Sequence, residues 1–223
     1  MKIVHSPRLE ATRRGAALLS AARRKLPGVE WLYTTDKVLG TIADTVNHQG
    51  VLAVLPIQKP NWEDLTRREG IVLLFWKLQD PGNLGTILRV AAAGGAAGII
   101  LSAGSTDPYS PKVVRAAMGS LFRIPFLQNQ DLKDCLQKLP AQGYRILAAE
   151  VQGGSSLWDV NFSPLTAVLF GQEGAGLPKE LVAATDGVLT IPMAPTAESI
   201  NVAIAAGLVI YESLRQKRPT MNG

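Results

Sequence analysis

The stretch IVLLFWKLQDPGNLGTILRVAAAGGAAGIILS, residues 71–102, has an apolar run at each end and a helical pattern between them. The end runs, 71–77 and 98–102, are short and continuously apolar, as buried strands are. Two such strands joined by a helix are typical of a parallel sheet. Asn83 and Arg89 flank the first helical turn that we expect here. Why an amide and a guanidinium stand beside an apolar sheet is the question that this stretch raises.

The alternation of apolar strands and helices continues to the end of the chain. We expect further strands at 123–127, 144–150, 166–171 and 188–193, helices that begin near 83, 111, 131 and 178, and a last helix over 199–216. Pro111 and Pro178 stand where a first helical position would fall, and Ser110 is a candidate cap. The pattern predicts an α/β fold, in which helices cover both faces of a parallel sheet.

A smaller block precedes this domain. We expect a helix at 8–25, a strand at 29–35, a short helix at 36–44 and a strand at 50–57. A block of this size buries little core by itself. Two prolines and a charge cluster without a clear period follow it, which is typical of a linker. The predicted organisation is a module at 1–57, a linker at 58–70 and a main domain at 71–223.

Composition limits the classes of protein to consider. The chain has 223 residues, of which 47% are hydrophobic and 18% charged, as in a globular protein with a sizeable core. Its apolar runs are too short to span a membrane, and its first residues lack the apolar core of a secretory signal. The single cysteine, Cys135, excludes an internal disulfide and a cysteine cluster for a metal. We therefore expect a cytoplasmic protein without membrane association or bound metal.

The net charge of +5 is unevenly distributed. A basic surface suits a polyanion such as nucleic acid, and a solvated face without a partner explains the charge equally well. The basic residues gather in the first helix, against Glu10 alone, and at the end of the chain: Arg8, Arg13, Arg14, Arg23, Arg24, Lys25, Arg215, Lys217 and Arg218.

The glycine-rich run GQEGAGL, 171–177, follows a predicted strand, at the sheet edge where open parallel sheets bind ligands. It is not placed as a dinucleotide-binding glycine motif would be, and it lacks the Lys and Ser or Thr of a phosphate-binding loop. It predicts a cleft lined by backbone, with Glu173 as its charged side chain. A tight turn that requires glycine would explain the glycines but not Glu173.

The last predicted helix is apolar on several faces, at Ile200, Val202, Ile204, Leu208, Val209 and Ile210. A helix that is apolar all round is buried all round, either centrally or against another subunit. Each aliphatic side chain left in water forgoes about 1.5–3 kcal/mol, so we expect a homodimer through this helix. Asn201 would need hydrogen-bond partners in such a helix. It is either a functional polar residue or a buried amide near the helix start whose hydrogen bonds are satisfied.

Three segments together resemble the ordered motifs of the SpoU/TrmH family of RNA ribose 2'-O-methyltransferases, in the SPOUT superfamily. They are LQDPGNLGTILRVAAAGGAAGIIL (78–101), VLFGQEGAGLP (168–178) and IPMAPTAESINVAIAAGLVIYE (191–212), and SPKVVRAAMGSLFRIP (110–125) is also family-like. The resemblance implies a C-terminal trefoil knot that holds S-adenosylmethionine, and dimers with the knots packed together. Residues 29–55 resemble the latter half of the small ribosomal-protein-like RNA-binding domain of many members, which implies a partial RNA-binding module.

The resemblance also implies roles for individual residues. Arg89 is implicated in activating the ribose hydroxyl, together with the motif residues Asn83, Glu173, Ser199 and Asn201. Cofactor contacts, largely from backbone, are implied at Gly171, Ile191 and Ile200, with Leu169 and Met193 nearby. The chain departs from the family pattern at Pro195, where Gly is common, and at Ala203, where Ser is common.

Methyl transfer from a sulfonium to a ribose hydroxyl is an in-line displacement. The hydroxyl must lose its proton or have its developing charge stabilised. His5 and His48, the only histidines, lie outside the main domain. Because arginine is normally always protonated, we expect Arg89 to hold an RNA phosphate and stabilise the alkoxide. Proton abstraction by Arg89 itself would require a strongly perturbed site, so proton loss to phosphate or water is the alternative, and the choice between base and charge stabiliser stays open.

The RNA substrate is open at this point. The partial RNA-binding module favours ribosomal RNA over transfer RNA, and the sequence does not specify the nucleotide. A catalytically silent RNA-binding protein on the same scaffold is a further alternative, against which the joint presence of the five motif residues argues. A nucleotide-binding oxidoreductase is disfavoured, because no G-x-G-x-x-G follows residue 77.

Overall fold

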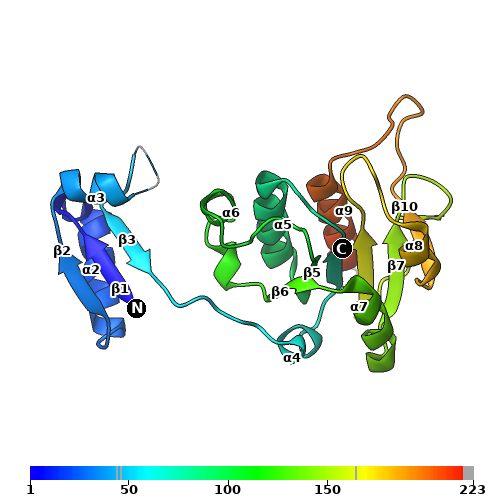
Figure 1. Cartoon of the computed structure of the whole chain (residues 1–223), viewed down its shortest axis with the longest axis horizontal. Helices are drawn as coiled ribbons and strands as arrows, with labels where there is room; N and C mark the ends of the chain where they lie inside the picture. The colour runs from blue at the N-terminus through cyan, green and yellow to red at the C-terminus, as the bar shows by residue number, and fades with distance from the viewer. Residues whose placement is uncertain (44, 46, 164, 218–223) are drawn as a thin grey trace, which may run out of the picture. The chain divides into compact units, whose positions relative to one another are not determined.

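The computed structural model describes residues 1–43, 45, 47–163 and 165–217, and the chain forms two compact units. The first unit is Met1–Gln58, and the second begins at Lys59 (Figure 1).

The first unit is a three-stranded sheet with short helices. Its strands are β1 (Lys2–His5), β2 (Glu30–Tyr33) and β3 (Val51–Val54), and its helices are α1 (Pro7–Glu10), α2 (Arg13–Lys25) and α3 (Asp36–Ile42). Strand β1 lies in the centre, parallel to β2 and antiparallel to β3. The sequence analysis missed β1 and predicted one helix over 8–25. That helix is interrupted, because Thr12 caps α2 by accepting a hydrogen bond from Gly15 N at 3.0 Å. The predicted helix 36–44 ends at Ile42, and residue 44 lies outside the described residues.

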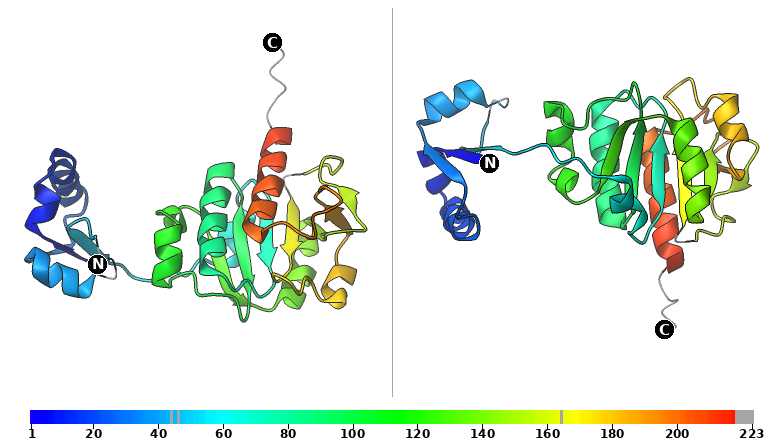
Figure 2. Two further views of the ribbon diagram at one scale, coloured as in Figure 1. Left: turned by 90° about the horizontal axis from the view of Figure 1, so that it is seen from above. Right: turned by 60° about the horizontal axis from the view of Figure 1, so that its bottom comes forward.

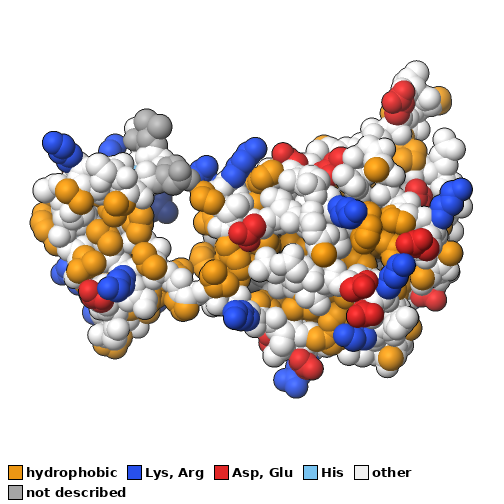
Figure 3. Space-filling view, in the orientation of Figure 1, with side chains coloured by type: hydrophobic (Ala, Val, Ile, Leu, Met, Phe, Trp, Pro, Cys, Tyr) orange, Lys and Arg blue, Asp and Glu red, His pale blue; other side chains and the backbone are white. Residues whose placement is uncertain are grey.

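The first unit buries little apolar surface. Among its described residues, the buried apolar side chains are Leu9, Leu19 and Leu39. More large apolar side chains are exposed, among them Leu18, Tyr33 and Ile57. Hydrophobic side chains are prominent on the face of this unit that Figure 3 shows. This agrees with the expectation, from its length, of a small core.

The segment predicted as a linker, 58–70, contains a helix, α4 (Trp62–Thr66). Asn61 and Asp64 form a capping box: the Asn61 side chain accepts from Asp64 N at 3.0 Å, and the Asp64 side chain accepts from Asn61 N at 2.8 Å. Leu65 is 1% exposed and packs in the core of the second unit. The segment predicted as a linker thus contains a helix that the sequence analysis did not predict, because its single turn gives no visible period.

The second unit is built on a parallel sheet of seven strands, in the order β6-β5-β4-β9-β7-β10-β8. All its strand pairings are parallel. The strands are β4 (Val72–Phe75), β5 (Gly98–Ser102), β6 (Phe126–Gln130), β7 (Arg145–Ala149), β8 (Ser155–Ser156), β9 (Thr166–Phe170) and β10 (Gly187–Thr190). The predicted parallel sheet is confirmed. Strand β6 begins later than the predicted 123–127, and β8 was not predicted. The trefoil knot stays a prediction.

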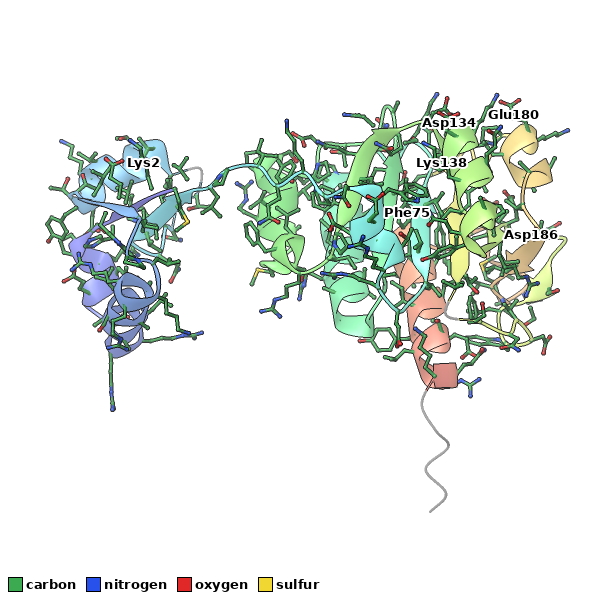
Figure 4. The ribbon with its side chains drawn as sticks, turned by 90° about the horizontal axis from the view of Figure 1, so that it is seen from below. Lys2, Phe75, Asp134, Lys138, Glu180 and Asp186 are labelled. Atoms are coloured by element: carbon green, nitrogen blue, oxygen red, sulfur yellow. The ribbon has the colours of Figure 1, made fainter. Side chains whose placement is uncertain are left out.

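Helices cover both faces of this sheet, as predicted (Figure 2). One face packs against α5 (Pro81–Gly94), α6 (Pro111–Ala116), the 3-10 turn η1 (Ser120–Phe122) and α9 (Val202–Lys217). The other packs against α4, α7 (Leu132–Lys138) and α8 (Lys179–Ala183), and a second 3-10 turn, η2 (Pro140–Gln142), follows α7. Phe75 and Phe170 stack on neighbouring strands with ring centroids 5.1 Å apart, and Figure 4 labels Phe75 among the strands.

The helix starts differ in part from the predictions. Asp80 caps α5 by accepting from Asn83 N at 2.7 Å, with Pro81 in the first turn. Pro111 does stand in the first turn of α6, but the Ser110 side chain makes no capping hydrogen bond. Pro178 is the N-cap residue of α8, not its first helical residue. The last helix begins at Val202, so Ser199 belongs to the preceding loop.

Glycines allow α5 to pack closely against its neighbours. A Cβ atom at Gly94 would lie 2.2 Å from Cγ2 of Ile210 on α9, and one at Gly85 would lie 2.3 Å from Cβ of Ala116 on α6. Such distances are far inside van der Waals contact, so larger residues at these positions would push the helices apart. This close packing fixes α5 and α9 next to each other.

Candidate functional site

A cavity of about 640 Å³ lies at the carboxyl ends of β7, β9 and β10. This volume lies within the range of sites that hold nucleotide-sized ligands, and the position is where parallel sheets bind them. Seven of the predicted site residues line it: Gly171, Glu173, Ile191, Met193, Ser199, Ile200 and Asn201.

The glycine-rich loop that forms one wall of the cavity is a tight turn. Gln172 N donates to Gly176 O at 3.1 Å, and Gly176 N donates to Gln172 O at 2.9 Å. Gly174 and Gly176 have positive φ angles, of 80° and 67°. A Cβ atom at Gly171 would lie 2.4 Å from the carbonyl carbon of Gly176. The turn and the backbone-lined cleft are therefore the same structure, and both require the glycines.

Asn83, Glu173 and Asn201 are joined by hydrogen bonds, although they lie far apart in the sequence. Asn83 Nδ2 donates to Glu173 Oε1 at 2.8 Å, and Asn201 Nδ2 donates to Asn83 Oδ1 at 2.9 Å. Asn83 thus uses both ends of its amide to connect the start of α5 with the glycine-rich loop and with the segment before α9. This connection answers why an amide stands at position 83.

Asn201 has a second role at the start of α9. Its Oδ1 accepts hydrogen bonds from Ala203 N at 2.9 Å and Ile204 N at 3.3 Å. The residue is exposed and precedes the helix. Asn201 is therefore a satisfied amide near the helix start, as the alternative expects, but it is exposed and not buried.

Three predicted residues are not part of the cavity wall: Asn83, which reaches it only through its hydrogen bonds to Glu173 and Asn201, Arg89 and Leu169. Arg89 is exposed on α5, six positions after Asn83, and within the described ranges its guanidinium makes no hydrogen bond or ion pair. Six residues correspond to about 9 Å along a helix axis, so Arg89 lies well beyond the Asn83 contacts. Leu169 is fully buried in the core between the sheet, α7 and α8.

The cavity also contains residues that the sequence analysis did not select, among them Glu150 and Glu198. Burial raises the pKa of Glu150 above its ordinary value. Glu150 is the last residue of the predicted strand 144–150, so its place at the carboxyl edge of a parallel sheet was the signal that could have identified it. Glu198 had no comparable signal.

The described residues contain neither a candidate membrane span nor a candidate metal site. No helix there is both long enough and apolar enough to cross a bilayer. In the same ranges, no group of three or more His, Cys, Asp or Glu side chains is arranged to hold a metal ion.

Comparison with known proteins relates this domain to RNA methyltransferases. Residues 70–211 match the model of the SpoU rRNA Methylase family. The chain is 42% identical over 197 residues to an uncharacterized tRNA/rRNA methyltransferase of Synechocystis sp.. This match covers 88% of this chain and 72% of that protein. It is 33% identical over 184 residues to the 23S rRNA (guanosine(2553)-2'-O)-methyltransferase RlmP of Bacillus subtilis, covering 82% of this chain and 72% of that one.

The structure also resembles a solved methyltransferase. The SpoU methyltransferase AviRb from Streptomyces viridochromogenes, crystallised in complex with the cofactor AdoMet, superposes with a TM-score of 0.82 at 28% sequence identity. The match covers 96% of this chain and 82% of that one. By the family model and by these relatives, the chain belongs to the SpoU rRNA methylase family.

Proposed function

We propose that this protein transfers a methyl group from S-adenosylmethionine to a ribose 2'-hydroxyl of ribosomal RNA. Family membership supports RNA ribose methylation as the reaction, and AviRb, which was crystallised with AdoMet, supports the cofactor. The B. subtilis relative is named as a methyltransferase of 23S rRNA, which favours ribosomal RNA as the substrate. Transfer RNA remains the alternative substrate, since the name of the Synechocystis relative includes both.

The cavity fits the proposed cofactor in size and in chemistry. Its volume of about 640 Å³ accommodates a nucleoside with an amino-acid tail. The glycine-rich loop presents backbone to the cavity, and backbone N–H and C=O groups can recognise an adenine edge. When bound, S-adenosylmethionine supplies a methyl group on a positively charged sulfur.

The hydrogen bonds of Asn83 are the observation that supports the site assignment most strongly. They tie Glu173 to α5 and to the residue that caps α9. We assign Asn83 and Asn201 to holding the glycine-rich loop and Glu173 in place at the cavity. Glu173 and Ser199 are exposed at the same cavity and would contact the ribose that approaches it.

Arg89 has the properties of a phosphate-binding residue. Its guanidinium is exposed and, among the described residues, has no protein partner. A guanidinium binds phosphate oxygens in a bidentate manner. We assign Arg89 to holding an RNA phosphate beside the target ribose and stabilising the negative charge that develops on the 2'-oxygen.

We also propose a homodimer, on narrower grounds than the sequence suggested. The sequence analysis predicted that one chain cannot cover all the apolar faces of α9. This was wrong for Val202, Val209 and Ile210, which are buried within the chain. Ile204, Leu208 and Tyr211 are exposed, at 59%, 36% and 52%. Their spacing places them on one helix face, which we call the α9 stripe, and a second copy of this chain would cover it.

The first unit supplies a basic surface for RNA. The cationic side chains of α2 are exposed, and the Arg23 guanidinium lies 5.6 Å from the centre of the Trp31 ring. Arg218, part of the basic C-terminal group, lies outside the described residues. We propose that this unit binds RNA, and that the protein acts in the cytoplasm.

The test is to map 2'-O-methyl groups in total RNA from cells with and without the gene. Loss of one ribosomal RNA site is expected. Restoration of that site by the intact gene would assign it to this protein. Loss of a transfer RNA site, with all ribosomal sites intact, would replace the main proposal by its alternative. An unchanged map would support the catalytically silent RNA-binding protein.

A further inference from the structure

The cofactor cavity is lined by carboxylates and by no cationic side chain. Glu150, Glu173 and Glu198 contribute to its wall. Among the described residues that line it, none is Lys, Arg or His. Such a wall carries negative charge without a balancing positive group, which favours a positively charged ligand.

Glu150 differs from the other two in its place. Ala149, the last residue of β7, is in register with Phe170 of β9 and Leu189 of β10, and Glu150 N donates to Leu189 O at 3.0 Å. Glu150 therefore continues the central strand of the three, between the ends of its neighbours. Its side chain is half-buried, whereas Glu173 and Glu198 are exposed.

Glu150 also lacks a compensating partner. Glu173 accepts a hydrogen bond from Asn83. The Glu150 carboxylate, in contrast, makes no hydrogen bond or ion pair with any side chain in the described part of the chain. Burial raises the pKa of Glu150, because removal from water disfavours the charged form. A cation in the cavity would offset that cost.

We propose that Glu150 makes the cavity prefer the positively charged sulfonium cofactor to its uncharged thioether product, S-adenosylhomocysteine. This inference rests on the proposed function. Methyl transfer leaves the bonding electron pair on sulfur, so the sulfur loses its charge while the rest of the molecule is unchanged. The attraction to Glu150 ends at that moment, and the product is released more readily than the cofactor.

The experiment compares three ligands by titration calorimetry on the full chain. They are S-adenosylmethionine, S-adenosylhomocysteine and sinefungin, which carries an ammonium-bearing carbon in place of the sulfonium. We expect Glu150→Gln to weaken binding of the two cationic ligands about tenfold more than binding of S-adenosylhomocysteine. Retained binding of S-adenosylhomocysteine also reports that the variant is folded.

A matched control removes one negative charge elsewhere. Glu180 is exposed on α8, outside the cavity lining, and pairs with Lys133 at 3.2 Å. Figure 4 labels it at the surface. Glu180→Gln is expected to leave the ratio of the three affinities unchanged. If Glu150→Gln binds none of the ligands, Glu150→Asp, which keeps the charge, replaces it and should retain the preference for the cationic ligands.

The outcomes separate this inference from the proposed function. Equal weakening of all three ligands by Glu150→Gln would overturn it, because Glu150 would then contact a part that they share, such as the ribose. No change for any ligand, or loss of the preference in Glu150→Asp, would also overturn it. Failure of the unmodified protein to bind any of the three would instead refute the proposed function.

Discussion

At the scale of single residues, Asn83 shows why an amide is required at the start of α5. Its Nδ2 donates to a carboxylate while its Oδ1 accepts from another amide. A carboxylate of the same shape could not donate, and it would face Glu173 with like charge. The family motifs identified the members of this network, but their direct contact depends on the fold and is not visible in the sequence.

Arg89 is expected to act on the substrate rather than on the cofactor. Because it does not line the cavity, Arg89→Ala should abolish methyl transfer and leave the Kd for S-adenosylmethionine within about threefold. Arg89→Lys should restore little activity, since an ammonium lacks the planar fork of a guanidinium. Single-turnover assays and calorimetry measure the two quantities. Turnover near the unmodified rate in Arg89→Ala would contradict the assignment.

Gly171 is expected to be indispensable for steric reasons. Its φ is not in the left-handed region, unlike those of Gly174 and Gly176, but a side chain there would overlap the Gly176 backbone. Gly171→Val should therefore distort the glycine-rich loop and prevent S-adenosylmethionine binding. Calorimetry gives the affinity, and circular dichroism checks that the rest of the chain is folded. Normal affinity in a folded variant would place the binding site elsewhere.

At the scale of helices and strands, apolar runs predicted the second unit's sheet well. Runs such as 71–77 and 166–171 contain β4 and β9, because a strand buried on both faces must be apolar throughout. Strand β1 was missed because its sequence, KIVH, has only two apolar residues between polar ones, and helix α4 because its single turn is too short to show a period. The distance between Arg89 and the cavity could not be inferred from the sequence. The apolar pattern of α5 predicts which face is buried, but it does not reveal which polar residues lie near the ends of other strands.

The end of α9 is held by a buried carboxylate. Hydrogen bonds from Arg215 above all, and also from Gln216, lower the pKa of Glu212 from its usual 4.5. Gln216 continues to the loop before β9, where its Nε2 donates to Val160 O at 2.9 Å and its Oε1 accepts from Phe162 N at 2.9 Å. Glu212 thereby supports both the helix and this loop.

This arrangement predicts a pH-dependent contribution to stability. Because the pKa of Glu212 is lowered in the folded state, its contribution is present above pH 4.5 and is lost as the pH falls through the lowered value. Glu212→Gln should be less stable at pH 7 and should lose less further stability on acidification. Urea unfolding at several pH values measures this, with Glu180→Gln as the control. Parallel curves for Glu212→Gln and the unmodified protein would contradict it.

At the scale of the whole molecule, the α9 stripe is expected to hold two copies together. Leu208→Glu places a charge in its centre and should give monomers that have lost methyl transfer. Lys217→Glu, at the exposed end of the same helix, is the control and should remain dimeric. Light scattering gives the mass. A stable, active monomer of 23.8 kDa for the unmodified protein would refute the dimer.

The order of the strands also affects how the chain is made. Strand β4 pairs with β5 on one side and with β9 on the other, and β9 follows it only after α5 to α7 and four other strands. At a synthesis rate of about 5–20 residues per second, the β9 side of β4 stays open for about five to twenty seconds on the ribosome. An unpaired, wholly apolar edge is a site of aggregation. We therefore expect shielding of this edge during synthesis to reduce aggregation, so the yield on overexpression should rise when chaperones are supplied.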